Sequence, residues 1–209
     1  MDIHSPTGPV ESLKDFFTHL LIVTVGILIA LSLEGLLEWH RHRELADEAR
    51  ANIISEIRAN EKDLQAFLDA VPEIRKNQMA ALDTVQGVLG RGKSDAPVTP
   101  FSFRLAELSN TSWTTSQTIG ALAFMPYAEV KKFAGVYQLQ DEYLRLQVRT
   151  EDAVVTALSL LAVNTNPGSL SRPELGAERD RILASVSALT AETQVGEFLE
   201  KAYAEVAKP

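Results

Sequence analysis

One stretch of the sequence matches a nucleotide-binding motif letter for letter. Residues 87–94 read GVLGRGKS, so Gly87 to Ser94 fit the P-loop pattern G-x-x-x-x-G-K-[ST]. A P-loop binds phosphates with backbone N–H groups that follow a buried strand and open a helix. Here the preceding residues are alanine-rich with helical spacing, and Pro97 and Pro100 stand where the phosphate-binding helix would run. We interpret the match as an inter-helix loop and keep nucleotide binding as an alternative.

The residue types that most often carry catalysis or metal binding occur only at the start of the chain. The chain has no cysteine, and its four histidines are His4, His19, His40 and His42. Histidine-dependent triads and histidine-ligated zinc or iron sites are therefore excluded within the rest of the chain. The adjacent acidic pairs at 141–142 and 151–152 point in different directions on a helix, so they do not form a paired acid and base. We expect a protein that is not an enzyme.

A metal site is the other chemistry to consider. Glu34, Glu38 and His42 recur at spacings of four, and His40 lies nearby. A single helix offers at most two adjacent ligands of this kind, which is not a closed ligand set. We expect surface pairs such as Glu38–His42 and Glu38–Arg41 instead, and we predict neither a metal nor a cofactor.

A ligand pocket is a further hypothesis, at residues Trp113, Gln117 and Tyr127. Trp113 and Gln117 belong to a region rich in serine and threonine, and Tyr127 follows an apolar patch. Such hydroxyls more often bond local backbone groups at helix ends, and large aromatics at a helix junction are usually core. Both interpretations stay open.

Residues 16–37, FFTHLLIVTVGILIALSLEGLL, are the most apolar segment of the chain. A helix needs roughly 20 residues to cross the hydrocarbon core of a bilayer. The segment is apolar on all faces, and Trp39 follows it where an interfacial aromatic belongs. The sequence therefore predicts a short tail at 1–15, a transmembrane helix at 16–39 and an all-helical soluble domain at 40–209, with a buried core helix as the alternative for the apolar segment.

The flanking charges bear on processing and orientation. A cleaved signal peptide would need a basic start, whereas the tail is acidic apart from Lys14. Arg41, Arg43 and Arg50 follow the span. The positive-inside rule then favours a cytoplasmic soluble domain.

One face of the predicted span carries small and polar residues. His19, Gly26, Ala30 and Glu34 share a stripe at helical spacings. Gly26 and Ala30 form a small-xxx-small pair that lets a second helix approach, and Glu34 is costly against lipid. The sequence predicts a helix–helix contact along this stripe. The alternative is that Glu34 only marks the membrane surface.

The rest of the chain shows helical periodicity interrupted by turn residues. An apolar stripe with Asn60 as its polar member runs to Val71, and Pro72 predicts a kink or a new start. Turns are expected at 90–100 and 164–168, and Pro126 is expected to open a helix. Ser171 and Glu174 form a capping-box pattern. No segment alternates with period two, so we predict an all-α protein with an antiparallel helical bundle.

Parts of the sequence resemble a group of bacterial proteins of unknown function that have one span and a helical soluble domain. The resemblance rests on Gly8-Pro9, Phe16, the run 26–31, Glu34, and Glu38-Trp39 before His42, together with a shorter likeness around Trp113 and residues 120–122. It implies a bacterial inner-membrane setting and no particular site residue.

Composition and charge narrow the partners. The chain has 28 acidic and 20 basic residues, a net charge of −8, which disfavours nucleic acid. We expect the lipid bilayer and either a second copy or another membrane protein as partners. The leading interpretation is a membrane-anchored interaction or scaffold protein. A sensory bundle with a ligand near Trp113 is the alternative, and a nucleotide-binding protein is a second one.

Overall fold

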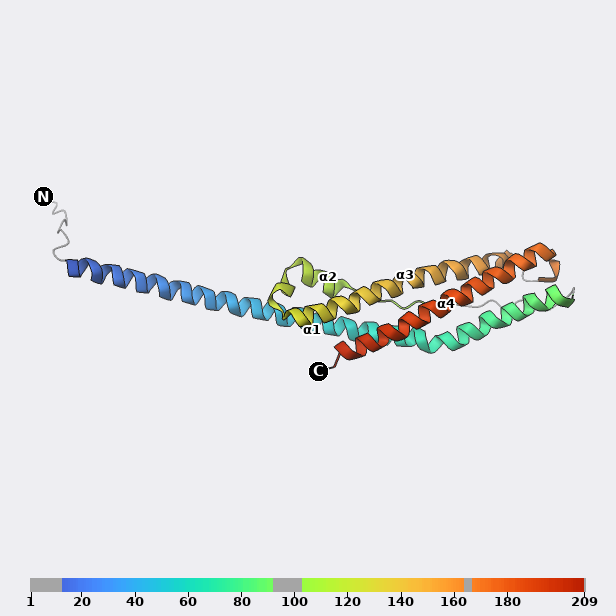
Figure 1. Cartoon of the computed structure of the whole chain (residues 1–209), viewed down its shortest axis with the longest axis horizontal. Coiled ribbons are helices and arrows are strands. Elements are labelled where there is room, and N and C mark those ends of the chain that lie inside the picture. The colour runs from blue at the N-terminus through green and yellow to red at the C-terminus, as the bar shows by residue number, and fades with distance from the viewer. Residues whose placement is uncertain (1–12, 92–102, 164–166, 209) are drawn as a thin grey trace, which may run out of the picture. The chain divides into compact units, whose positions relative to one another are not determined.

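The computed structural model describes residues 13–91, 103–163 and 167–208, and all regular structure in these ranges is helical (Figure 1). The elements are α1 (Leu13–Arg91), α2 (Thr111–Thr118), the 3-10 helix η1 (Ala121–Phe124), α3 (Tyr127–Val163), the 3-10 helix η2 (Pro167–Ser169) and α4 (Arg172–Val206). The predicted all-α class, with a long apolar N-terminal helix and a helical bundle, is confirmed. The chain divides into two compact units, Met1–Glu48 and Ala49–Pro209.

Helix α1 continues through Pro72, where the sequence predicted a kink or a new start. A proline inside a helix removes one backbone hydrogen bond, here the one to the carbonyl of Leu68. Val71 and Ile74, on either side, are buried and hold both flanking turns against the bundle. The alternative of a new helix start at this point is therefore wrong, because packing outweighs the lost hydrogen bond, and the alternative of a kink stays a prediction.

Within the second unit, α1 and α3 run in the same direction. Arg50 near the start of this unit pairs with Glu129 at the start of α3. Ten residues further on, Asn60 bonds to Gln140. Two parallel helices need a connection that returns along the bundle, and residues 103–110 form the described part of that crossover. The predicted antiparallel arrangement is therefore wrong for this pair of helices, because the crossover carries the chain back before α3 begins.

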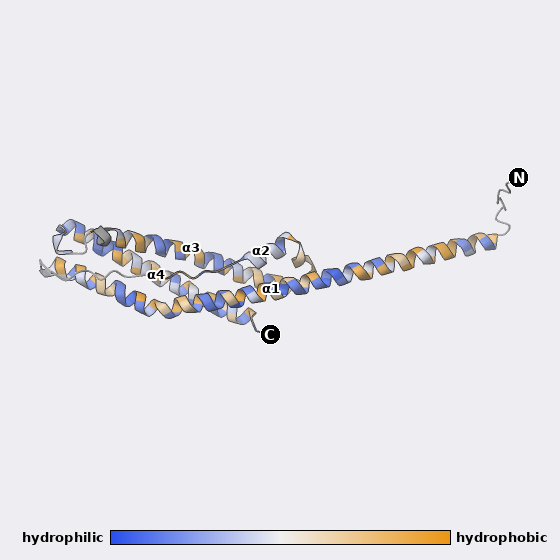
Figure 2. Ribbon diagram, turned by 180° about the vertical axis from the view of Figure 1, so that it is seen from behind, coloured by the Kyte–Doolittle hydropathy of each residue, from blue (hydrophilic) through white to orange (hydrophobic). Residues whose placement is uncertain are grey.

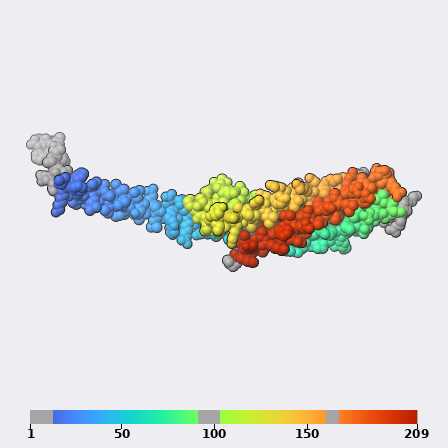
Figure 3. Space-filling view, in the orientation of Figure 1, coloured from blue at the N-terminus to red at the C-terminus, as the bar shows by residue number. Residues whose placement is uncertain are grey.

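Helix α4 runs antiparallel to both α1 and α3. At its start, Arg172 donates to the carbonyl of Leu89 near the end of α1. After its end, the carbonyl of Ala207 accepts a bond from Arg58. Helices α3 and α4 lie side by side along their length (Figures 1 and 3). We call the end near Arg50 and α2 the proximal end of the bundle, and the end near Leu89 the distal end.

The core follows the predicted apolar stripe of α1. Ile53, Ile57, Leu64, Phe67 and Val71 are all buried. Phe133, Tyr137 and Val154 of α3 are buried as well, whereas Val148 of the same helix is 56% exposed. Gly196 of α4 lets the helices approach closely, since a Cβ there would lie 3.3 Å from side-chain atoms of both Leu68 and Tyr143.

The ends of the bundle helices carry the expected local signals. Ser171 caps α4 in a capping box, and its backbone N–H donates to Glu174 at 2.7 Å. Bonds from the hydroxyl and the N–H of Ser171 lower the pKa of Glu174. Pro126 directly precedes α3, and its carbonyl accepts the N–H of Val130. Between α2 and η1 the chain turns at Gly120, whose φ of 75° favours glycine.

Candidate functional site

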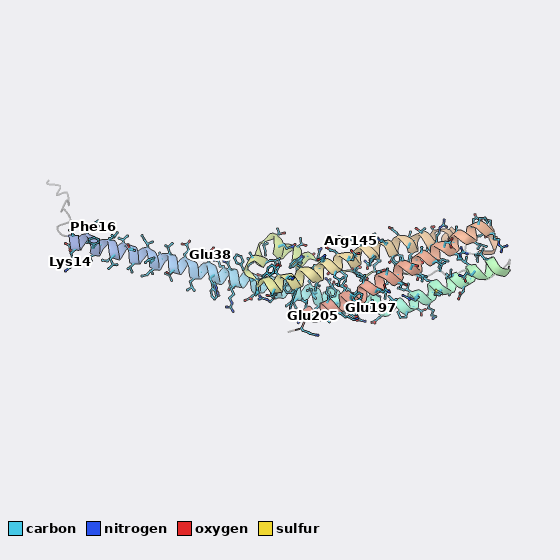
Figure 4. All side chains as sticks on the ribbon, in the orientation of Figure 1. Lys14, Phe16, Glu38, Arg145, Glu197 and Glu205 are labelled. Atoms are coloured by element: carbon cyan, nitrogen blue, oxygen red, sulfur yellow. The ribbon has the colours of Figure 1, made fainter. Side chains whose placement is uncertain are left out.

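The first part of α1 is an apolar helix without cover from its own chain. Every side chain from residue 13 to residue 41 is exposed, and Figure 2 shows a run of hydrophobic residues along this part. By length and composition this is the one helix in the described ranges that is long and apolar enough to cross a membrane. Lys14 and Glu38 stand at its two ends (Figure 4). They are about 36 Å apart along a helix, compared with a hydrocarbon core of about 30 Å.

The polar side chains inside this apolar run bond to their own helix. The hydroxyls of Thr18, Thr24 and Ser32 donate to the carbonyls four residues earlier at 2.7–2.8 Å. His19 Nδ1 lies 2.9 Å from the carbonyl of Asp15. A hydroxyl that is satisfied in this way needs no water. The segment can therefore enter an apolar medium at low cost despite these residues.

The predicted contact stripe lies on this exposed helix. His19, Gly26, Ala30 and Glu34 are all exposed, and a Cβ built on Gly26 meets no atom within 4 Å. The same holds for Gly35, on the opposite face. The stripe is open to another molecule, and its proposed role is taken up below.

Beyond the apolar run, charged side chains pair along the same helix. His42 lies 3.8 Å from Glu38, as the sequence predicted, and His40 lies 3.2 Å from Glu44. The Arg43 guanidinium lies 5.6 Å from the centroid of the Trp39 ring. A tryptophan and an arginine together are typical of a membrane–water interface. The two histidines thus belong to separate pairs on one helix.

In the bundle, the crossover segment is held by side-chain amides. Asn60 makes two bonds with the backbone of Ser109, donating to its carbonyl at 2.7 Å and accepting from its N–H at 2.9 Å. Gln140 also donates to this carbonyl at 3.0 Å, and its own oxygen accepts the Tyr203 hydroxyl at 2.6 Å. Asn60, Gln140 and Tyr203 are almost fully buried. Helices α1, α3 and α4 therefore fix one peptide of the crossover together.

Gln147 holds a second residue of the crossover, Ala106, in the same way. It accepts the N–H of Ala106 at 2.9 Å and donates to its carbonyl at 3.2 Å. The Tyr143 hydroxyl lies 3.2 Å from both Gln147 Oε1 and Glu192 Oε1. Burial raises the pKa of Glu192 to about 7, although bonds from Thr150 and Tyr143 oppose the shift. Burial and the nearby Glu192 also raise the pKa of Tyr143.

Glu56 organises the start of α2. Its carboxylate accepts the Ser112 N–H at 2.8 Å, the Tyr137 hydroxyl at 2.7 Å and the Ser109 hydroxyl at 2.9 Å. Burial alone would raise the pKa of Glu56, but these bonds together lower it. A carboxylate at a helix N-terminus is stabilised by the N–H groups that point at it. Glu56 therefore anchors the hydroxyl-rich segment, which the sequence had placed at a turn or cap and which forms helix α2.

The three residues of the predicted pocket have different surroundings. Trp113 is buried and stacks on Tyr137, with ring centroids 5.3 Å apart and planes at 14°. Gln117 is exposed, and Tyr127 is 82% exposed. Trp113 thus contributes to the core, and a shared pocket for these residues stays a prediction.

The P-loop match falls partly on helix α1. Gly87 and Gly90 lie inside this helix, which ends at Arg91. A P-loop needs its first glycine in a loop after a strand. This part of the match lacks that context, and residues 92–94 lie outside the described ranges.

Several of the central residues are ones that sequence reasoning had not singled out. Gln140, Gln147 and Glu192 are buried polar residues on helices α3 and α4. For Glu192 the sequence does contain a signal, because helical spacing places this residue on the apolar face of α4. It follows the buried Leu189 by three residues and precedes the buried Leu199 by seven. A polar residue on an apolar stripe suggests a buried hydrogen bond but does not reveal its partner.

The comparisons with known proteins do not add a family. The chain matches no family model, no curated protein and no solved structure.

Proposed function

We propose that the protein is a membrane-anchored helical scaffold that self-associates, or holds a second membrane protein, through one face of its span. The observation that carries the proposal is the uncovered apolar run of α1, residues 16–37. An apolar surface of this extent is unfavourable in water, so it needs lipid or another apolar molecule around it. The absence of cover from the described part of the chain supports a span over a buried core helix.

The stripe of His19, Gly26, Ala30 and Glu34 supplies the contact. Small residues let two helix axes approach, so that van der Waals packing holds them together in lipid. Glu34 is costly against hydrocarbon and gains from a hydrogen bond to a neighbouring helix. Together they favour a second helix on this face over lipid.

The setting we propose is a bacterial inner membrane with the bundle on the cytoplasmic side. The basic residues Arg41, Arg43 and Arg50 follow the span, against Lys14 before it. The acidic surface disfavours nucleic acid as a partner. The function proposed is therefore assembly and not catalysis.

The proposal is tested by cross-linking the full-length chain in native membranes. Gly26→Ile should lower the cross-linked fraction, because the larger side chain separates the helices. Glu34→Leu should lower it through the lost hydrogen bond, and Glu34→Gln should restore part of it. Gly35→Ile is the matched control, since position 35 lies about 180° around the helix from position 26.

Three outcomes decide the result. Self-links that fall in Gly26→Ile but not in Gly35→Ile support a homo-oligomer. Links to one second protein that fall in the same variant support an accessory subunit. If both Gly26→Ile and Glu34→Leu leave all links undiminished, the stripe is not a contact surface.

A further inference from the structure

A long uncharged stretch lies between the crossover and helix α3. No charged residue occurs between Glu107 and Glu129, although charged residues make up 23% of the chain. This stretch contains α2, η1 and the first residues of α3. A solvated surface ordinarily carries charges, and their absence here means that no buried or exposed charge in this stretch opposes contact with an apolar surface.

The stretch has a fixed apolar tip. Ile119 is 53% exposed, Phe124 44% and Tyr127 82%. Their neighbours Ala121 and Met125 are buried in the bundle. The exposed side chains are therefore presented by an anchored turn, in which Gly120 reverses the chain between α2 and η1.

The tip is located at the proximal end of the bundle. Glu56 of α1 holds the start of α2. Arg50 of α1 donates to Glu129, two residues after Tyr127, at 2.9 Å. Figures 1 and 2 both draw α2 at this end of the bundle. The tip is thus tied to the part of α1 that directly follows the first unit.

The charge next to the tip is positive. Lys131 and Lys132 are exposed on the turn of α3 that follows Tyr127 and Ala128. The carboxylate of Glu129, which precedes both lysines, is paired with Arg50. Aromatic and aliphatic side chains beside lysines are typical of segments that lie in the interface of anionic membranes.

We propose that the tip, formed by Ile119, Phe124, Tyr127, Lys131 and Lys132, docks on the lipid surface, with its apolar side chains at the headgroup level and its lysines on anionic headgroups. The inference rests on the membrane anchoring in the proposed function. It adds a second lipid contact, made by the bundle itself.

The absence of cysteine in the native chain allows a direct test. The full-length protein is reconstituted in vesicles of phosphatidylcholine with or without phosphatidylglycerol, and single cysteines are labelled with an environment-sensitive fluorophore. Ala123→Cys reports the tip, and Ala177→Cys, also exposed but at the distal end near Leu175, is the matched control. Leu31→Cys reports the span. Lipids that carry a quencher at the upper acyl chain report contact with each position.

The expected result is loss of fluorescence at positions 31 and 123 but not at 177, with a larger loss at 123 when anionic lipid is present. Phe124→Asp with Tyr127→Asp should abolish the loss at 123. Lys131→Glu with Lys132→Glu should remove its dependence on anionic lipid. Far-UV circular dichroism of both variants establishes that the bundle is intact.

Other outcomes separate this inference from the proposed function. Quenching at 31 with none at 123 overturns the docking and leaves the anchoring intact. Absence of quenching at 31 overturns the anchoring and the docking with it. Quenching at 123 by a labelled second copy, without quenching by lipid, overturns the docking in favour of a protein contact.

Discussion

The two ends of the bundle are built on different principles. At the distal end, helices α1, α3 and α4 meet in an apolar cluster made up of Ala81, Leu82, Val85, Val88, Val154, Ala157, Leu175 and Ile182. At the proximal end, the same three helices meet around the crossover through Asn60, Gln140 and Tyr203. Apolar packing is non-directional, whereas a hydrogen bond requires a particular partner at a particular angle. The proximal end therefore fixes the register of the helices, and the distal end mainly contributes burial.

The buried polar groups of the two ends also differ in how completely they are hydrogen-bonded. Asn60 and Gln140 have partners for both their oxygen and their nitrogen atoms. Toward the distal end, Gln78 and Glu178 are fully buried, and each leaves one oxygen without a hydrogen-bond partner among the described residues. An unsatisfied buried oxygen costs free energy, and a satisfied network contributes to a unique packing. Substitutions at the two ends should therefore have unequal effects.

The largest effect is expected at Glu192, and it depends on pH. The pKa of Glu192 is about 7 in the folded protein, against 4.5 for an ordinary glutamate. Between these values the folded state holds a proton that the unfolded state has lost, so the free energy of unfolding falls as pH rises from 4.5 to 7. The loss amounts to at most about 3 kcal/mol. Glu192→Gln cannot ionise and should be the more stable protein at pH 8.

The measurement is urea unfolding of the full-length chain in detergent at pH 5 and pH 8. The free energy of unfolding of Glu192→Gln should exceed that of the wild type at pH 8 but not at pH 5. Equal differences at both values would show that Glu192 is not protonated near neutrality.

A smaller effect, about 2 kcal/mol, is expected for Asn60→Leu. Leucine has the same number and branching of side-chain heavy atoms as asparagine but leaves the N–H of Ser109 without its partner, and an unsatisfied buried group costs roughly 1–3 kcal/mol. The variant should unfold at lower urea concentration, followed by the fluorescence of the buried Trp113. A stability equal to that of the wild type would contradict the role of the amide in fixing the crossover.

The smallest effect, less than about 1 kcal/mol, is expected for Gln78→Leu. The Gln78 amide makes one long bond of 3.4 Å to the Ser185 hydroxyl, which also donates to the carbonyl of Ile182 at 2.8 Å. Loss of the bond from Gln78 leaves the Ser185 hydroxyl satisfied by the carbonyl of Ile182. The substitution also removes the unpaired oxygen of Gln78. If Gln78→Leu proved as harmful as Asn60→Leu, the contrast between the two ends would fail.

The sequence was informative wherever the signal is local. The apolar run at 16–37, the stripe from Ile53 to Val71 and the capping box at Ser171 and Glu174 depend on residues close to one another in the chain. Each was predicted and appears as expected. Helix periodicity and capping are properties of a few turns, so one sequence suffices to see them.

The features that were not predicted all depend on distant partners. Glu56 bonds to Tyr137, and Gln147 bonds to Ala106, across separations of 81 and 41 residues. The continuation of α1 through Pro72 likewise depends on what its flanking turns pack against. A buried polar residue is visible in a sequence only as an exception to a pattern, and its partner is set by the three-dimensional arrangement.

The parallel course of α1 and α3 has a consequence for how the protein is made. Helices α3 and α4 are neighbours in sequence and can pair as soon as both have left the ribosome, whereas α1 must wait for partners such as Glu129, 79 residues beyond Arg50. Contacts across such separations form late, because closing a long loop costs entropy before any contact repays it. During synthesis the stripe of Ile53, Ile57 and Leu64 is therefore without its helical partners until α3 and α4 have been made. For that interval the nascent α1 is an unpaired amphipathic helix, and its uncovered apolar stripe is the part of the bundle most prone to aggregate before folding is complete.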